Sequence, residues 1–291
     1  MISIIISSAQ KHLLDNVSNN IKQTIGVPFE ILAFDNSKGE KGICEIYNTG
    51  TSRAKYDMLC FMHEDVSIKT ENWGTVVLNI FKERPEIGLL GLAGSKYKTL
   101  APSGFYCHDE MLRLNILQEF KYGAEDDRIS VHNPDQEKVT EVVSVDGVWF
   151  CCPKVVALKY PFDEQLFKGF HCYDIDFSLG IRAGYKVAVT FEVLLVHFSE
   201  GNYERQWVEQ TLMMQDKWRS ILPISLLPLS RKAMLKYEKN AFRFFLEKMN
   251  ASGFSKMEMS SVLWKSKLYS KFGLSLLLKL QFFILKPKSR V

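Results

Sequence analysis

Residues 58–66 read MLCFMHEDV, an uninterrupted apolar run that leads straight into His63-Glu64-Asp65. A run of this length bounded by charge is typical of a strand buried on both faces, as in a parallel sheet covered by helices. The polar end of such a strand lies at the carboxyl edge of the sheet, where open α/β sheets bind their ligands. Two carboxylates and an imidazole gathered there can hold a divalent cation, and a cation can hold a phosphate. The alternative is a solvated strand end without a ligand.

Segments around this strand alternate between strand-like and helix-like patterns. Residues 2–7 are β-branched and apolar, residues 11–24 repeat apolar side chains at helical spacing, and residues 29–34 form a second apolar run before Asp35. Alternation of this kind predicts parallel strands joined by right-handed crossovers. We therefore predict an α/β fold with a mostly parallel, Rossmann-like sheet flanked by helices, and we expect Asp35 at the same sheet edge as Asp65.

Two stretches between the strands offer polar groups to a ligand. Residues 42–55 predict a helix, on which Asn48 and Arg53 either face a bound nucleotide or lie on the surface. Residues 96–140 are polar and lack long apolar runs, so we expect an irregular loop there. Long loops in compact domains tend to carry function, and this one is a candidate for shaping an acceptor pocket.

The second half of the chain adds polar groups at strand and helix ends. Residues 141–153 predict a strand, a turn and a strand, with Asp146 and Trp149 at the bend. Asp174 falls in the first turn of a predicted helix, where capping explains a carboxylate, although a carboxylate held there can also act as a base. His197 ends the last predicted strand, either as an ordinary core or edge histidine or as a metal ligand.

Composition indicates a globular protein with one large domain and an extension. The chain has 291 residues, of which 46% are hydrophobic and 24% charged, a balance that argues against disorder and low complexity. Its six cysteines form no Cys-x-x-Cys pair and several lie in apolar runs, so we expect reduced thiols and a cytoplasmic location. The apolar start of the chain has no basic lead and is too short for a signal peptide, so it is interpreted as a strand.

Charge divides the chain into two parts. Residues 231–291 hold fourteen Lys and Arg against three Glu, a net charge of +11, which leaves −7 for residues 1–230. We predict a domain over residues 1–220 and a basic, amphipathic helical extension over residues 221–291. The last apolar stretch of the extension, residues 272–285, is shorter than the roughly 20 residues needed to cross a bilayer.

The extension is open to three interpretations. A basic helix of this kind can lie on an anionic membrane surface, or it can pack its apolar face on the domain or on a second copy. Nucleic acid is the weakest interpretation, because no nucleic-acid motif accompanies the charge. We therefore expect no nucleic-acid partner.

Five polar segments, taken together and in chain order, resemble the family 2 type of glycosyltransferase with the GT-A fold. They are Asp35, His63-Glu64-Asp65, Asp146-Gly147, Tyr173-Asp174-Ile175-Asp176 and His197. The resemblance covers about residues 1–200. It implies a nucleotide-sugar donor bound across the sheet edge, a Mn²⁺ or Mg²⁺ ion, and transfer with inversion at the anomeric carbon.

The resemblance assigns roles to individual residues. Asp65 matches the last Asp of the family's Asp-x-Asp motif and, with His197, is the expected metal ligand; Asp174 takes the place of the catalytic base. Two residues depart from the pattern, because His63 replaces the first Asp and Tyr173 replaces the Glu that commonly precedes the base. We expect donor contacts from Ser7, Asp35, Asn48, Arg53 and Glu64, and acceptor contacts from Asp146, Trp149, His171 and Asp176.

The predicted function is that of a bacterial-type inverting glycosyltransferase. Its donor would be a nucleotide sugar, with uridine as the default base, and its acceptor a glycan or a lipid-linked molecule. The predicted location is cytoplasmic and peripheral on the inner face of the cell membrane. Two alternatives stay open: a nucleotidyltransferase, and a degenerate glycosyltransferase-like module that binds a glycan or a partner without catalysis.

Overall fold

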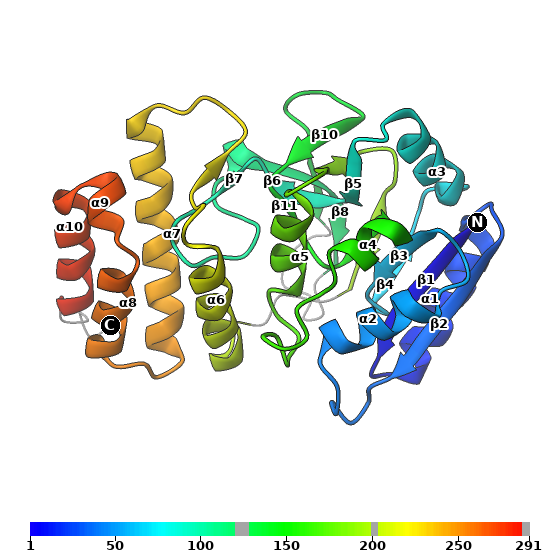
Figure 1. Ribbon diagram of the computed structural model, residues 1–291, viewed down its shortest axis with the longest axis horizontal. Coiled ribbons are helices and arrows are strands. Elements are labelled where there is room, and N and C mark those ends of the chain that lie inside the picture. The colour runs from blue at the N-terminus through cyan, green and yellow to red at the C-terminus, as the bar shows by residue number, and fades with distance from the viewer. Residues whose placement is uncertain (120–127, 199–202, 287–291) are drawn as a thin grey trace.

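A seven-stranded sheet forms the centre of the protein, whose computed structural model describes residues 1–119, 128–198 and 203–286 (Figure 1). The strands lie in the order β10-β13-β5-β12-β3-β1-β2. Their bounds are β1 (Ile2–Ser8), β2 (Phe29–Asp35), β3 (Met58–Met62), β5 (Ile87–Gly91), β10 (Val139–Val142), β12 (Trp149–Pro153) and β13 (Lys186–Thr190).

Strand β3 is buried along its whole length, as predicted, because helices cover both faces of the sheet. Leu59 and Phe61 point into one core layer and Cys60 into the other. The first layer includes residues of α2 (Ile43–Arg53), α4 (Lys154–Lys159) and α5 (Tyr173–Ile181), and the second includes residues of α1 (Lys11–Thr24) and α3 (Trp73–Glu83).

The sheet is mixed because β10 and β12 run opposite to the other five strands. Strand β1 pairs in parallel with β2 and β3, and β13 does so with β5, whereas β12 runs antiparallel to both of its neighbours, β3 and β5. The predicted α/β class with flanking helices is confirmed, and parallel pairs occur among β1, β2 and β3, which α1 and α2 connect, and between β5 and β13.

A second sheet occupies much of the stretch that we expected to be an irregular loop, so that expectation was wrong. Its order is β11-β6-β8-β14-β4, with β9 paired to β8. The bounds are β4 (Val66–Ile68), β6 (Ala93–Ser95), β8 (Leu112–Gln118), β9 (Arg128–His132), β11 (Ser144–Val145) and β14 (Leu195–His197). A separate two-stranded sheet pairs β7 (Tyr97–Lys98) with β15 (Ile224–Ser225), and the 3-10 turn Asp109–Met111 precedes β8.

Buried polar residues explain why β8 carries no apolar signature. Arg113 is 2% exposed, and its guanidinium binds Asp135 at 2.7–2.8 Å. Asn115 is also buried and donates from Nδ2 to the backbone oxygen of Val193 at 2.7 Å. Part of the predicted loop, residues 120–127, lies outside the described residues.

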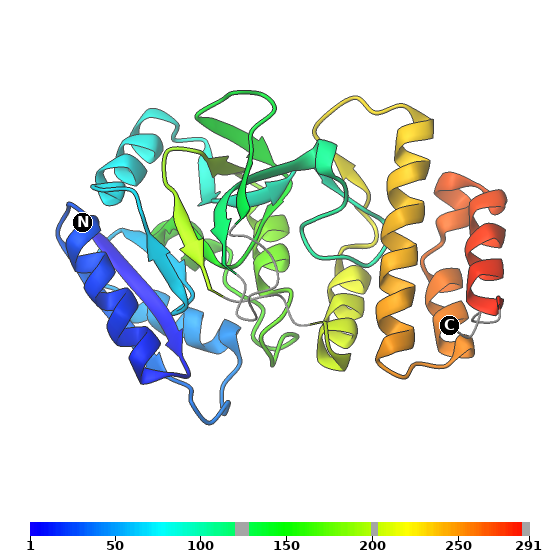
Figure 2. The same cartoon turned by 180° about the vertical axis from the view of Figure 1, so that it is seen from behind.

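The C-terminal helices stand side by side at the end of the molecule opposite the N-terminus, as Figure 2 shows from behind. They are α6 (Arg205–Trp218), α7 (Arg231–Ala251), α8 (Lys256–Lys265), α9 (Leu268–Phe272) and α10 (Leu274–Leu285). The predicted helical extension is interrupted by positive φ angles at Lys267 (55°) and Gly273 (91°). No helix within the described ranges has the length and apolar character needed to cross a membrane.

A shared core joins α6 to the helices of the extension. Trp207 and Val208 of α6 pack in the same cluster as Phe245 and Leu246 of α7 and Leu277 of α10. This cluster contains residues from both sides of the domain boundary that we predicted between residues 220 and 221. The boundary itself stays a prediction.

A buried carboxylate fixes α7 to the strand β7 and the turn that follows it. Glu238 has no exposed surface; its Oε1 accepts hydrogen bonds from Tyr97 Oη and Leu100 N at 2.8 Å, and its Oε2 accepts one from Ala101 N at 2.9 Å. Burial raises the pKa of Glu238 to about 7 from an ordinary 4.5.

We expect the Glu238 carboxyl to make stability depend on pH. The unfolded chain releases this proton near pH 4.5 and the folded protein near pH 7, so folding takes up a proton between these values and stability falls as pH rises through them. The free energy of unfolding, measured by urea denaturation at pH 5 and pH 7.5, should differ between these pH values by less in Glu238→Gln than in the wild type. The reduction should be on the order of 3 kcal/mol. Glu247→Gln, at an exposed position of the same helix, should leave the fall unchanged, and an equal fall in the Glu238→Gln variant would contradict the assignment.

Candidate active site

Three parallel strands end together at the edge where the polar residues were expected. Ser8 at the end of β1 lies opposite Asp35 at the end of β2, and β3 ends at Met62, immediately before His63. Asp35 is exposed, and its Oδ1 accepts a hydrogen bond from Ser37 N at 2.9 Å. That backbone hydrogen bond lowers the pKa of Asp35 below its ordinary 3.8.

His63, Asp65 and His197 come together at this edge. Each offers one ligand atom, and these atoms all lie within 4.8 Å of one another. Asp65 Oδ1 lies 3.8 Å from His63 Nδ1 and 3.7 Å from His197 Nε2. Asp65 and His197 were the predicted ligands; the imidazole of His63 was grouped with the carboxylates at this edge but was not assigned as a ligand. The available signal was its position directly after the buried strand and two residues before Asp65.

The second sheet places His197 next to His63 and Asp65. Strand β14 pairs antiparallel with β4, which places His197 opposite Val66, and Phe198 N donates to Asp65 O at 3.0 Å. The resulting donor set of two imidazoles and one carboxylate fits a divalent transition metal, because Mg²⁺ prefers oxygen ligands. Of the two ions expected from the sequence, Mn²⁺ fits this set better.

Two carboxylates lie together beside the candidate metal ligands. Asp174 lies in the first turn of helix α5, and Asp146 lies in the turn between β11 and β12, where its Oδ1 accepts a hydrogen bond from Val148 N at 3.0 Å. Burial raises the pKa of Asp174 to about 7, and the nearby charge of Asp146 adds to this increase. A carboxylate that gains its proton near neutral pH is suited to general base catalysis.

Tyr173 connects the carboxylates to the candidate metal ligands. Its hydroxyl lies 3.0 Å from His63 Nε2 and 3.1 Å from the backbone oxygen of Gly147. Tyr173 is followed directly by Asp174, and Gly147 directly follows Asp146. The candidate base and the candidate metal ligands are therefore parts of one site.

Trp149 lies in the core, so the prediction that it contacts an acceptor was wrong. Its side chain has no exposed surface, and its ring packs edge-on against Trp73 with the ring centres 5.8 Å apart. Stacking on a sugar requires an exposed ring face. The apolar pattern of β12, in which Trp149 is the first residue, was the better guide to its role.

Asn48 and Asp176 use their polar atoms to join elements of the fold. Asn48 Nδ2 donates to Phe162 O at 2.9 Å, and Asn48 Oδ1 accepts from Phe162 N at 3.0 Å. Asp176 is 4% exposed and binds Lys217 and Trp218 Nε1 of helix α6. These contacts give both residues a structural role, and the ligand contacts expected of them stay predictions.

Glu64 stabilises the start of helix α1. Its carboxylate accepts hydrogen bonds from Ser8 Oγ at 2.6 Å and from the backbone nitrogens of Ala9 and Gln10 at 3.0–3.3 Å. A carboxylate at this position satisfies backbone N–H groups and the positive end of the helix dipole. Glu64 thus makes a capping contact, and the donor contact expected of it stays a prediction.

Three further predicted residues lie around the edge in different environments. Arg53 is exposed, with its guanidinium 5.8 Å from the centre of the Phe34 ring. His171 is half-buried, its pKa is lowered by burial, and its backbone N–H donates to Gln210 Oε1 at 3.1 Å. Ser7 has a buried Oγ without a hydrogen-bond partner among the described residues, and it stays the clearest candidate for a donor contact near the end of β1.

Comparisons with known proteins agree on one family and fold. A model of the "Glycosyltransferase like family" matches residues 3–219. Residues 1–349 of S. aureus TarS, alone and in complex with UDP, are 10% identical, with 99% of this chain and 93% of that chain covered and a TM-score of 0.51. GalNAc-T7 with UDP, GalNAc and Mn²⁺ is 12% identical over 86% of this chain and 56% of that chain, with a TM-score of 0.50. A search of curated proteins gave no match. The structural neighbours are GT-A glycosyltransferases, and this chain shares their fold.

Removing Asp65 should abolish metal binding. Its carboxylate is the only charged group of the three described candidate ligands, and even outer partners of metal ligands contribute roughly 10- to 100-fold to affinity. Titration of the Asp65→Ala variant with Mn²⁺ in a calorimeter should show affinity at least about 100-fold weaker than that of the wild type. Asp15→Ala, at an exposed position in α1, is the control, and equal Mn²⁺ affinity in the two variants would remove Asp65 from the site.

Proposed function

Since the chain belongs to the glycosyltransferase-like family that matches residues 3–219, we propose that it is a metal-dependent, inverting glycosyltransferase. It moves a sugar from a nucleotide-sugar donor, with UDP as the carrier, to a glycan or lipid-linked acceptor. One observation carries the proposal: Tyr173 touches His63 of the candidate metal ligands and is followed directly by Asp174, the candidate base. The site therefore has a donor side and an acceptor side in contact.

The donor side would lie at the ends of β1, β2 and β3. A divalent cation held by His63, Asp65 and His197 would supply positive charge to the diphosphate group that leaves with the nucleotide. Ser7 and the exposed Asp35 lie at the neighbouring strand ends, within the same edge. The UDP of the TarS complex and the UDP and Mn²⁺ of GalNAc-T7 support a UDP-sugar and a transition metal for this chain as well.

The acceptor side would lie at Asp146 and Asp174. An acceptor hydroxyl becomes a nucleophile when a carboxylate removes its proton, and this role is typically worth roughly 10² to 10⁴ in rate. Asp174 takes that proton on Oδ1 or Oδ2, and burial, together with the charge of Asp146, raises the pKa of Asp174 and makes it a stronger base than an ordinary carboxylate. A single displacement with the base opposite the leaving group inverts the anomeric carbon.

Asp174→Asn should remove transfer while leaving the donor side intact. The amide cannot accept the acceptor's proton, so we expect the rate of sugar transfer to fall by at least about 100-fold with an unchanged calorimetric Kd for UDP in the presence of Mn²⁺. In the wild-type protein, kcat/KM should fall as pH decreases below about 7, where Asp174 is protonated. A fully active variant would place the base elsewhere, and a wild-type protein that binds no nucleoside diphosphate would favour a non-catalytic module.

We further propose that the protein works in the cytoplasm, bound peripherally to the inner face of the cell membrane through helix α10. One side of this helix packs into the core with Leu276, Leu277, Leu280 and Ile284. The other side exposes an apolar stripe, each residue of which is 52–69% exposed: Leu274, Leu278, Phe282 and Leu285. Packing on the rest of the protein and contact with a membrane thus involve different faces of α10.

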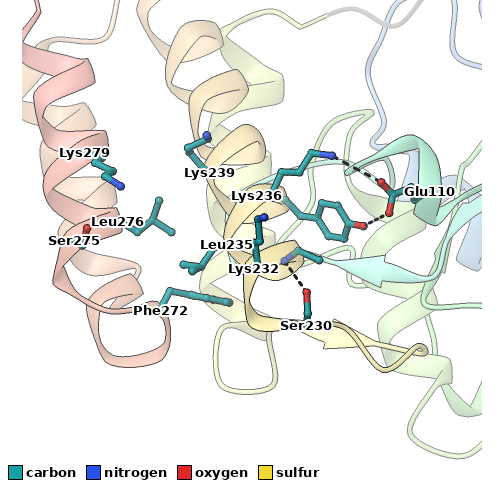
Figure 3. A pocket seen from close by; sticks show the side chains of 12 residues that line it. Glu110, Ser230, Lys232, Leu235, Lys236, Lys239, Phe272, Ser275, Leu276 and Lys279 are labelled. Atoms are coloured by element: carbon teal, nitrogen blue, oxygen red, sulfur yellow. Dashed lines mark hydrogen bonds and ion pairs between the residues drawn. The ribbon is translucent and has the colours of Figure 1, made fainter.

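A basic groove beside this stripe complements anionic lipid headgroups. Between α7 and α10 lies an open pocket of about 550 Å³, lined by Lys232, Lys236, Lys239 and Lys279 (Figure 3). An adjoining hollow shares Lys239 and Lys279 with it and adds Arg243, Leu278 and Phe282. Exposed apolar side chains next to lysines are the combination that holds an interfacial helix on an anionic bilayer. A bilayer is therefore the occupant that we propose for this surface.

Replacing the stripe should release the protein from anionic vesicles. Leu278→Ser with Phe282→Ser removes two exposed apolar side chains from α10, so co-sedimentation with phosphatidylglycerol vesicles should decrease, whereas Leu158→Ser, at an exposed position of α4, should not change it. Wild-type binding should weaken with added salt and should be absent with neutral phosphatidylcholine vesicles. Equal sedimentation of the double variant and the wild type, or a concentration-dependent dimer lost in the double variant, would contradict the proposal.

A further inference from the structure

Tyr173 is buried, and its hydroxyl lies within hydrogen-bonding distance of two groups, which differ in whether they can donate as well as accept a hydrogen bond. The backbone oxygen of Gly147, 3.1 Å away, can only accept a hydrogen bond. His63 Nε2, 3.0 Å away, can donate or accept according to the tautomer of the ring. Since the hydroxyl has a single proton, both contacts are hydrogen bonds only when Tyr173 donates to Gly147 and His63 Nε2–H donates to Tyr173.

This arrangement decides which nitrogen of His63 keeps its lone pair. A neutral imidazole with its proton on Nε2 has its free lone pair on Nδ1. Nδ1 is the nitrogen that lies 3.8 Å from Asp65 Oδ1, on the side of the candidate metal ligands. The tautomer that Tyr173 requires is thus the one that a metal ion requires.

The position of the Tyr173 hydroxyl depends on a glycine. A Cβ at residue 147 would lie 2.1 Å from Tyr173 Oη and 2.6 Å from its Cζ, distances at which atoms overlap. Any side chain at Gly147 would therefore displace the hydroxyl from its place between His63 and the backbone. Gly147, Tyr173 and His63 form one contact chain from the β11–β12 turn to the candidate metal ligands.

His197 is oriented in a matching way. Gln118 Nε2 donates to the backbone oxygen of His197 at 3.1 Å, which turns Gln118 Oε1 toward His197 Nδ1 at 3.3 Å. An oxygen at that place accepts a hydrogen bond from Nδ1–H, so the neutral ring carries its proton on Nδ1 and its lone pair on Nε2, which lies 3.7 Å from Asp65 Oδ1. Both imidazoles thus have a protein oxygen on the nitrogen that faces away from Asp65.

We propose that Tyr173 is a positioning residue for the metal site: it holds His63 in the Nε2–H tautomer, so that Nδ1 is ready to ligate the cation. The inference rests on the proposed metal-dependent function. Outer partners of ligating histidines typically contribute about 10- to 100-fold to metal affinity. Tyr173 acts through His63 and needs no contact with the donor, the acceptor or the ion.

The first experiment reads the tautomer directly in the metal-free protein. The ring ¹⁵N shifts and long-range ¹H–¹⁵N couplings of His63, assigned with a His63→Gln variant, should show the proton on Nε2 at pH 8 in the wild type. Tyr173→Phe, which removes only the hydroxyl, should shift the ring to a mixture of tautomers. A wild-type ring with its proton on Nδ1 would overturn the proposal, and this measurement does not require any variant to be active.

The second experiment measures Mn²⁺ affinity by calorimetry without donor or acceptor. Tyr173→Phe and Gly147→Ala should each weaken binding by about 10- to 100-fold, while Tyr160→Phe, outside the site, should not. Circular dichroism and the unfolding temperature identify a variant that has lost its fold. Unchanged affinity in folded Tyr173→Phe protein would overturn the positioning role. Absence of Mn²⁺ binding in the wild type would instead refute the proposed metal-dependent function, a result that the tautomer measurement keeps distinct.

Discussion

Antiparallel pairing between β4 and β14 is the constraint on which the candidate site depends. Strand β4 follows the His63-Glu64-Asp65 run directly, and β14 ends in His197, so each ladder hydrogen bond between them also fixes the separation of the candidate ligands. The central sheet alone would present His63 and Asp65 at the end of β3. The second sheet adds the third ligand from more than a hundred residues away in the chain.

The extension reaches the same region through buried polar groups. Glu238 of α7 binds the backbone that follows β7, and the fully buried Lys98 of β7 donates to Ser103. Burial lowers the pKa of Lys98 to about 8, and the charges of Glu238 and Asp174 both oppose that shift. A lysine that responds to a carboxylate in α7 and to the candidate base lies between the two parts of the protein. The carboxylate of Glu238 therefore holds the C-terminal helices on the segment that also contains Lys98 and Ser103.

Apolar periodicity was a good guide to the elements and a poor one to side-chain roles. The buried run of β3 and the helical spacing of α1 predicted both elements closely, because burial of apolar area decides where such segments lie. Strand β8 was missed because its buried positions include Arg113 and Asn115, whose polar groups are satisfied by partners distant in the sequence. Trp149 was assigned to an acceptor because it lies near a turn, although its own strand is apolar. Partners such as Phe162 for Asn48, or α6 for Asp176, arise only from tertiary packing.

The two departures from the family pattern support each other. Taken singly, a histidine in place of the first Asp removes a charged ligand, and a tyrosine in place of the Glu removes a carboxylate beside the base. In the folded protein the two replaced residues touch, with the Tyr173 hydroxyl 3.0 Å from His63 Nε2. A divalent ion held by one carboxylate and two neutral imidazoles keeps a net positive charge, whereas two carboxylates would neutralise it. The greater residual charge strengthens attraction for a diphosphate, so the combination of His63 and Tyr173 is consistent with a working donor site of different electrostatics.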